Sequence, residues 1–184
     1  MIIYIHGFSG SGEGSKARAF RKYFKNKGDN FIVPSLSYIP DLAIKTLEEL
    51  IESYDGDVEL IGSSLGGFYT LYLADKYKLK AVLINPSIYP YITLDKLLGN
   101  APSFYDDSSF TWMESHLEML KKYETKVQSQ SDFMLLVQKG DELLDYEEAV
   151  NKLPDARVIA EEDGNHGFEG IERHFTEVRM FFGL

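Results

Sequence analysis

The chain has 184 residues, of which 44% are hydrophobic and 26% are charged, and this composition is typical of one folded globular domain rather than a disordered chain. The formal net charge of −10 disfavours binding to nucleic acid, because an acidic surface repels a polyanion. The absence of cysteine excludes disulfides, thiolate zinc sites, iron–sulfur clusters and a cysteine nucleophile.

The start of the chain shows no secretory signal. The apolar run that follows Met1 ends at His6 and Gly7, which is far too early for a signal-peptide core or a membrane span. We therefore expect a cytoplasmic protein with no segment inserted in a membrane.

Short apolar runs alternate with amphipathic stretches along the chain. Strands are predicted at Ile2–Ile5, Asn30–Val33, Asp57–Ile61, Ala81–Ile84, Phe133–Gln138 and Arg157–Ala160. Apolar residues at helical spacing predict helices around 17–24, 43–54, 65–73 and 168–182. This alternation predicts an α/β fold in which a doubly wound, mostly parallel six-stranded sheet forms a single domain, 1–184. Right-handed crossovers place the carboxyl ends of the strands at one edge, where a ligand crevice forms.

The segment 85–132 breaks the alternation. It contains several prolines and aromatic residues and only one clear helical pattern, around Thr111 to Tyr123. Because long ordered connections in compact domains are often lids or binding loops, we expect a short lid-like or pocket-forming segment here.

Gly62, Ser64 and Gly66 form the pattern Gly-x-Ser-x-Gly between a predicted strand and a predicted helix. A sharp turn from strand to helix strains the central serine, and side chains two positions away on either side would collide. The strain holds the hydroxyl above the sheet at a helix N-terminus, where a developing negative charge is favoured. Ser64 is therefore the candidate nucleophile.

A serine hydroxyl needs a base to take its proton, and the chain offers four histidines. His116 and His174 fall within amphipathic helical patterns, where surface or half-buried positions are expected. His166 follows the last predicted strand in a polar glycine loop, from which an imidazole can reach Ser64. His6 is expected to support the loop after the first strand through a hydrogen bond and to take no part in proton transfer.

An acidic group must orient this base. Asp141 follows the strand 133–138 most closely and comes between the serine and the histidine in chain order, as in α/β-hydrolases. Glu142 and Asp145 are alternatives, because the pattern alone does not separate neighbouring carboxylates.

Two backbone N–H groups are expected to stabilise an oxyanion. One belongs to Leu65, directly after the nucleophile, and the other to Phe8, where Gly7 lets the backbone approach the substrate. This glycine- and serine-rich loop has neither the Gly-Lys-Ser/Thr ending of a P-loop nor a Gly-x-Gly-x-x-Gly pattern, so nucleotide binding is disfavoured.

Several motifs in order make the chain resemble the α/β-hydrolase superfamily, and more narrowly the small bacterial YqiA-type esterases. They are Ile-Tyr-Ile-His-Gly-Phe at 3–8, Gly-Ser-Ser-Leu-Gly-Gly-Phe at 62–68, Asn-Pro-Ser at 85–87, Gly-Asp-Glu-Leu-Leu-Asp-Tyr at 140–146 and Gly-Asn-His at 164–166. The resemblance implies a minimal α/β-hydrolase fold that lacks the first two strands. It also implies a catalytic triad of Ser64, Asp141 and His166.

The expected function is that of a serine carboxylesterase that cleaves small acyl esters through an acyl-enzyme, without a metal or an organic cofactor. Gly7, Phe8, Tyr89 and Trp112 are the candidate substrate-binding residues. Acyl-CoA thioesters are a second substrate class. The competing hypotheses are a non-catalytic binding protein on a hydrolase fold and a protein that recruits a partner through the aromatic segment 85–132.

Overall fold

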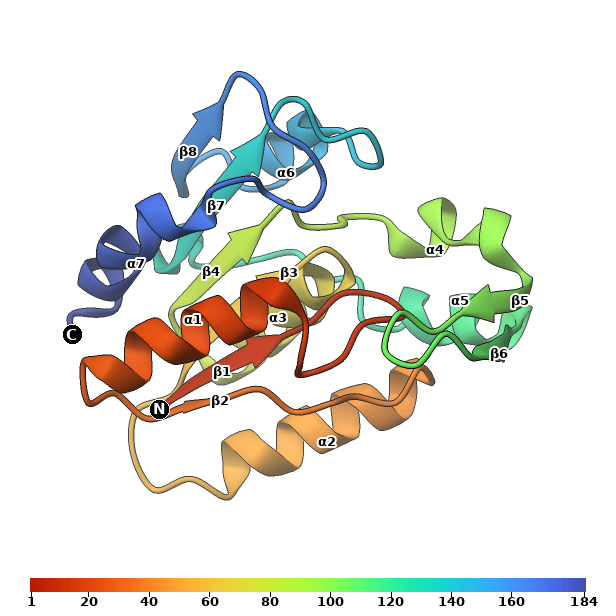
Figure 1. The fold of residues 1–184 in the computed structure, drawn as a ribbon, viewed down its shortest axis with the longest axis horizontal. Helices are drawn as coiled ribbons and strands as arrows, with labels where there is room; N and C mark the ends of the chain where they lie inside the picture. Colours follow the sequence, from red (N-terminus) through yellow and green to blue (C-terminus); the bar gives the residue numbers. More distant parts are fainter.

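The structure, a computed structural model, describes residues 1–184. Its centre is a six-stranded sheet with the order β2-β1-β3-β4-β7-β8, in which every neighbouring pair is parallel (Figure 1). The strands are β1 (Ile2–Ile5), β2 (Phe31–Ile32), β3 (Glu59–Ser63), β4 (Ala81–Ile84), β7 (Phe133–Gln138) and β8 (Arg157–Glu161). The predicted doubly wound parallel sheet is confirmed, although β2 is shorter than expected and β3 lies two residues further along the chain.

Helices cover both faces of this sheet because its strands alternate between two hydrophobic cores. In β1, the side chains of Ile2 and Tyr4 join one core and those of Ile3 and Ile5 join the other. The first core packs against α1 (Ser15–Asn26) and α7 (Phe175–Phe182), which lie on the same side in Figure 1. The second packs against α2 (Pro40–Glu52), α3 (Leu65–Tyr77), α5 (Glu114–Lys121) and α6 (Tyr146–Lys152). A strand buried on both faces needs apolar residues throughout, as the sequence of β1 shows.

The segment 85–132 contains more structure than its sequence predicts. After α4 (Pro90–Thr93) and a 3₁₀ turn, β5 (Gly99–Pro102) and β6 (Ser109–Trp112) form an antiparallel hairpin that the sequence analysis did not identify. Figure 1 shows this hairpin and α4 beyond the carboxyl ends of the central strands. The helix expected around Thr111 to Tyr123 begins only at Glu114, because residues 109–112 pair with β5 instead.

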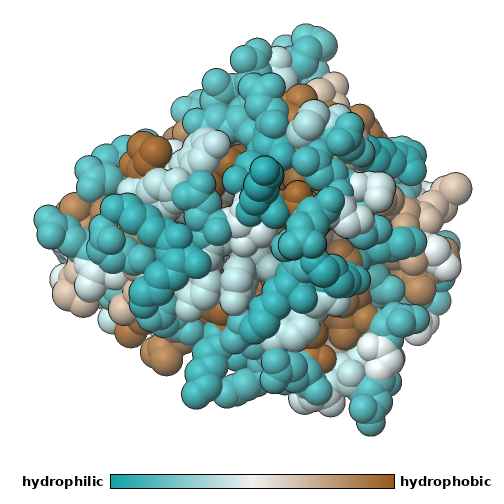
Figure 2. Space-filling model, turned by 180° about the vertical axis from the view of Figure 1, so that it is seen from behind, coloured by the Kyte–Doolittle hydropathy of each residue, from teal (hydrophilic) through white to brown (hydrophobic).

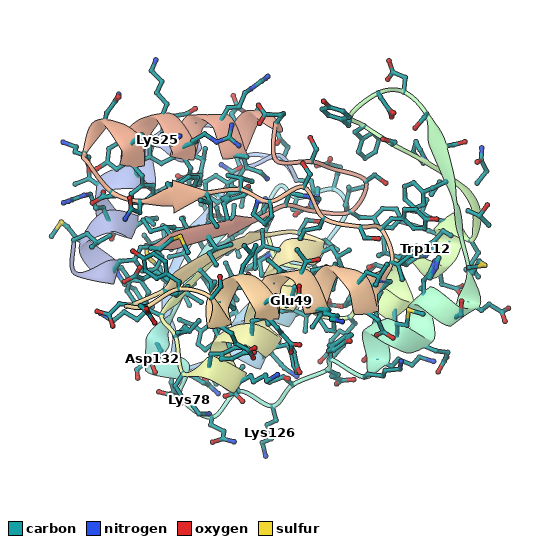
Figure 3. All side chains as sticks on the ribbon, turned by 90° about the horizontal axis from the view of Figure 1, so that it is seen from below. Lys25, Glu49, Lys78, Trp112, Lys126 and Asp132 are labelled. Carbon is teal, nitrogen blue, oxygen red and sulfur yellow. The ribbon has the colours of Figure 1, made fainter.

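Trp112 fixes the hairpin to the rest of the protein. Figure 3 shows its side chain at the hairpin, and it is only 1% exposed. Its ring lies 4.8 Å from the ring of Phe8 and 4.8 Å from the ring of His116. Phe8 belongs to the loop after β1 and His116 to α5, so one indole holds three segments together.

The outer surface is mainly polar on the side away from α1 and α7. Figure 2 shows this face covered mostly by hydrophilic side chains, with apolar ones scattered among them. None of the helices combines the length and the hydropathy that crossing a lipid bilayer requires.

We predict that Trp112→Ala lowers the free energy of unfolding by about 3 kcal/mol, because it leaves a cavity among three packed segments. Urea denaturation followed by circular dichroism measures this change. Phe104→Ala is the matched control, since Phe104 lies in the same hairpin connection and is 73% exposed; its effect should stay within about 0.5 kcal/mol. Equal effects of the two substitutions would contradict the anchoring role of Trp112.

Candidate active site

The site begins at the turn between β3 and α3, where Ser64 adopts the conformation that the sequence predicts. Its φ of 56° and ψ of −123° lie outside the regions that residues other than glycine commonly occupy. A Cβ atom at Gly66 would overlap the carbonyl oxygen of Ile5, and one at Gly62 would overlap Thr70 Oγ1. Glycine is therefore required at both positions for the turn to pack against β1 and α3.

Neighbouring backbone groups hold Ser64 in this strained state. Its N–H donates to the carbonyl of Ile84 at 3.1 Å, and its own carbonyl accepts from the N–H groups of Gly67 and Ser87 at 2.9 and 3.0 Å. Residues in such conformations persist only where the surroundings determine them, and they occur preferentially at functional sites.

His166 and Asp141 meet Ser64 above the carboxyl edge of the sheet. The Ser64 Oγ lies 3.0 Å from His166 Nε2, and His166 Nδ1 lies 2.8 Å from Asp141 Oδ2. The order of these contacts means that Nδ1–H donates to the carboxylate, which leaves Nε2 free to accept the serine proton. The three residues lie in separate loops, yet they form one continuous chain of hydrogen bonds.

Asp141 is held as a charged acceptor. Its side chain is 3% exposed, and besides His166 it accepts hydrogen bonds from the N–H groups of Leu143 and Leu144, at 2.8 and 3.0 Å. Burial raises the pKa of this carboxyl, but the hydrogen bonds from His166 and from the two N–H groups outweigh burial and hold the pKa below its usual value. Asp141 is therefore ionised at neutral pH.

The two alternative acids have other contacts. Glu142 accepts a hydrogen bond from the backbone N–H of His166 at 2.9 Å, which fixes the loop rather than the imidazole ring. The side chain of Asp145 caps α6 by accepting from the N–H of Glu147 at 2.9 Å. Of the three carboxylates, only Asp141 contacts the ring.

The backbone N–H groups of Phe8 and Leu65 donate to no acceptor of the protein. Both residues line the cavity that contains Ser64, so these donors are free for an oxyanion there. Glycine at position 7 lets the loop after β1 lie close to Ser64, since a Cβ at that position would be only 3.0 Å from Ser64 Cβ.

His6 supports the loop that carries Phe8. Its Nδ1 lies 2.9 Å from the carbonyl of Gly7, and its Nε2 accepts from the N–H of Leu36 at 3.0 Å. Burial lowers the pKa of His6, and the acceptor role of Nε2 requires the neutral ring. The structural role that the sequence suggests for His6 agrees with these contacts.

A cavity of about 460 Å³ opens in front of Ser64, which is within the range of small-molecule sites. Gly7 and Phe8 line it, together with Leu94, Leu97, Pro102 and Phe104 from the segment 85–132. Tyr89 and Trp112 do not line this cavity, contrary to the expectation that both bind substrate. Trp112 is buried behind Phe8, and Tyr89 packs against the hydrophobic core on the α3 side of the sheet.

The other two histidines, His116 and His174, do not line this cavity. His116 is 1% exposed, so the surface or half-buried position expected for it is wrong: the packing of its ring against Trp112 and Tyr38 buries it. His174 is half-buried and its Nε2 contacts Glu161. No group of three or more His, Asp or Glu side chains in the chain is arranged to hold a metal ion.

Sequence reasoning did not identify the residues that position the His166 loop. Asn85 donates from its side-chain amide to the carbonyls of Asn165 and His166, at 3.0 and 3.2 Å, and it accepts from the N–H of Gln138. Gln138 in turn accepts from the N–H of Asn165 at 3.1 Å. The signal in the sequence is a polar residue at the end of each of two apolar strand runs, Asn85 after Ala81–Ile84 and Gln138 in Phe133–Gln138. Both side chains are buried, and buried polar groups need hydrogen-bond partners.

Comparison with known proteins places nearly the whole chain in one family. The profile of the uncharacterised protein family UPF0227 matches residues 1–183. The chain belongs to the UPF0227 family. It is similar to a UPF0227 protein of Vibrio cholerae serotype O1, with 26% identity over 98% of both chains, and to one of Pectobacterium atrosepticum, with 23% identity over the same share of each.

Solved structures similar to this UPF0227 protein share its fold at low identity. The mouse alpha/beta hydrolase domain-containing protein 10 superimposes with a TM-score of 0.77 at 20% identity, covering 99% of this chain and 89% of its own. Est1E from Butyrivibrio proteoclasticus with bound ferulic acid gives a TM-score of 0.74 at 14% identity, covering 98% and 86%. The fold is therefore a minimal α/β-hydrolase fold, as the resemblance in sequence implies.

The loop that carries His166 is also fixed by an ionic cluster around Glu161, at the end of β8. Glu161 accepts hydrogen bonds from Gln138, Arg173 and His174. Burial raises the pKa of Glu161, but these hydrogen bonds and the charge of Arg173 outweigh it and lower the pKa to about 2.

We predict that Glu161→Gln destabilises the protein by about 1–2 kcal/mol at pH 7, because the carboxylate is stabilised only in the folded state. A lowered pKa gives stability that is complete above the unfolded-state value, about 4.5, and is lost as the pH falls towards 2. The difference between wild type and variant should therefore be constant from pH 7 to 5 and shrink below pH 4.5. Urea denaturation at these pH values measures it, with Glu162→Gln, at an exposed carboxylate, as control. A difference that does not depend on pH would contradict the prediction.

Proposed function

We propose that this UPF0227 protein is a serine hydrolase, specifically a carboxylesterase that cleaves small acyl esters through an acyl-enzyme. The observation that carries the proposal is the continuous chain of contacts from Ser64 Oγ through His166 to Asp141. Ser64, at one end of this chain of contacts, lines a cavity that the free backbone N–H groups of Phe8 and Leu65 also reach. A nucleophile, a base, an orienting acid and oxyanion donors are the parts that acyl transfer requires.

In the first half of the reaction, His166 Nε2 accepts the proton of Ser64 as Oγ attacks the ester carbonyl carbon. The carbonyl oxygen becomes an oxyanion and accepts hydrogen bonds from the N–H groups of Phe8 and Leu65. Each such donor typically contributes about 3–4 kcal/mol to stabilisation of the transition state. The protonated imidazole, stabilised by Asp141, then gives its proton to the leaving alcohol as the tetrahedral intermediate collapses to the acyl-enzyme.

In the second half, water takes the place of the alcohol. His166 accepts a proton from the water as its oxygen attacks the acyl carbonyl, and returns that proton to Ser64 Oγ as the carboxylic acid leaves. The strained turn contributes in both halves without a rearrangement of the backbone, because it positions Oγ as the attacking atom in the first half and as the leaving group in the second.

The cavity supports a small acyl group. Its volume of about 460 Å³ is enough for such a group, and the apolar side chains of the segment 85–132 in its wall suit a hydrocarbon chain. Among the structural neighbours, Est1E holds ferulic acid and a protein from Sphingobium faniae is described as a pyrethroid hydrolase. Such names support ester chemistry on this fold without defining the substrate here.

A binding protein without catalysis is the main alternative, and a partner-recruiting role for the segment 85–132 is the other. The first gives no reason for a strained Ser64 in hydrogen-bond contact with His166. The second predicts no open path to Ser64, whereas this segment lines the cavity that leads to it. Thioesters need the same residues as esters, so the choice between the two substrate classes depends on turnover of both.

We predict that an alkyl fluorophosphonate labels the protein at Ser64 and that Ser64→Ala abolishes the labelling. The reason is that the probe reacts only with a serine whose proton a base removes. Mass spectrometry of the intact protein and of its peptides measures the outcome. Wild-type protein unfolded by heat should not react. The control Ser53→Ala should react as wild type does, because Ser53 is a surface serine whose hydroxyl donates a hydrogen bond to the carbonyl of Leu50. Labelling that survives Ser64→Ala would contradict the assignment.

We predict that Asp141→Asn lowers kcat for a chromogenic acyl ester by about ten thousandfold, because the amide favours the wrong tautomer of His166. Asp145→Asn is the matched control, since asparagine also caps a helix and this side chain does not contact His166. Its kcat should stay within about twofold of wild type. A severe loss in Asp145→Asn, or none in Asp141→Asn, would show that the acid is assigned to the wrong residue.

A further inference from the structure

Lys16 lines the same cavity as Ser64 and His166 and has no role in the proposed mechanism. It is half-buried in the first turn of α1. Its ammonium group takes part in none of the ion pairs of the protein, which use other cations. A cation removed partly from water and left without a partner weakens the folded state, so another reason for its presence is required.

The position is unfavourable for a positive charge. The N-terminal end of a helix carries a partial positive charge, and the first turn of α1 contains no acidic residue and no side-chain cap. Burial lowers the pKa of Lys16 to about 8, although the charge of Asp141 raises it. Lys16 is therefore still mostly protonated at neutral pH. Asp141 itself is already hydrogen-bonded to His166 and to two backbone N–H groups.

Other unpaired donors lie in the same wall. The backbone N–H groups of Ser15, Lys16 and Ala17 have no acceptor, as is usual in the first turn of a helix, and all three residues line the cavity. The hydroxyl of Ser9 is buried, has no hydrogen-bond partner and belongs to a residue of the same wall. Lys96, an exposed residue of the segment 85–132 that forms no ion pair, adds a second positive charge to the cavity lining.

We propose that the substrate carries an anionic group, a carboxylate or a phosphate, which binds Lys16 in the wall formed by the loop after β1 and the start of α1. This inference rests on the proposed hydrolase function and narrows its substrate class. An anion supplies the partner that the ammonium lacks, and it is favoured by the free N–H groups at the N-terminus of α1. In a protein with a net charge of −10, unpaired lysines in the cavity also attract an anion that the rest of the surface repels.

A positioning role for Lys16 is the competing explanation. Its charge favours the ionised form of Asp141 and could act on the reaction through that residue alone. In that case, loss of Lys16 would slow the hydrolysis of neutral and anionic esters equally. Binding of an anion by Lys16 affects only substrates that carry the negative charge.

The test compares esters that differ in charge and little in size. On the acyl side, mono-4-nitrophenyl glutarate is paired with its neutral methyl ester, and a terminal phosphonate analogue distinguishes phosphate from carboxylate binding. On the leaving-group side, 4-acetoxybenzoate is paired with 4-acetoxybenzamide. The proteins are wild type, Lys16→Gln and the matched control Lys22→Gln. Lys22 is an exposed lysine of the same helix that neither forms an ion pair nor lines the cavity.

We expect Lys16→Gln to lower kcat/KM for at least one anionic ester by about tenfold to a hundredfold, the usual effect of losing one hydrogen bond to a charged group. The neutral member of that pair should change by less than about twofold, and Lys22→Gln should change neither. Equal losses for both members of each pair would overturn the inference in favour of positioning. No loss for any ester would overturn it as well.

Binding to an inactive protein separates this inference from the proposed function. In calorimetry of the Ser64→Ala protein, the carboxylate of glutaric acid monoamide should bind, whereas the neutral diamide should not. Adding Lys16→Gln should remove that binding, and adding Lys22→Gln should keep it. If wild type neither hydrolyses an ester nor reacts with the fluorophosphonate, the proposed function fails and this titration alone decides the anion site. Binding of neither compound, or binding that survives Lys16→Gln, overturns the inference.

Discussion

The close packing of β1 against the turn between β3 and α3 is the constraint on which the site depends. Gly66 lies against the backbone of Ile5, and a side chain of any kind there would push the start of α3 away from β1. This contact brings the loop after β1, with the free N–H of Phe8, next to the strained Ser64. The nucleophile and the oxyanion donors are therefore positioned by one backbone contact at the point where the strand order of the sheet reverses.

The other half of the site is positioned from β4, β7 and β8. Asn85, at the end of β4, binds the loop that carries His166, and Gln138, at the end of β7, holds the same loop from the neighbouring strand. The short connection after β7 also carries Asp141. Because parallel strands end at one edge, residues that are distant in sequence converge there. The side-chain amides of Asn85 and Gln138 and the ionic cluster around Glu161 together hold the loop that carries His166.

Much of this arrangement could be predicted from the sequence because it depends on local patterns. Near-continuous apolar runs define buried parallel strands, and a serine flanked by glycines between a strand and a helix defines the turn. The hairpin of β5 and β6 could not be predicted, since its strands are only half apolar and pair with each other outside the main sheet. Tyr89 and Trp112 show a second limit: an aromatic residue near a site can face the core or the cavity, and composition does not distinguish them. Lys16 shows a third limit of prediction from sequence, because its lack of an ion-pair partner is a property of tertiary packing alone.

The central claim is that Ser64 becomes acylated during turnover of an ester. Peptide mass spectrometry of protein quenched in acid within the first turnover tests this most directly. We predict that the peptide containing Ser64 gains the mass of the acyl group, that the gain disappears as substrate is exhausted, and that His166→Ala does not form the acylated peptide. Turnover without any acylated peptide, or with the acyl group on a residue other than Ser64, would contradict it.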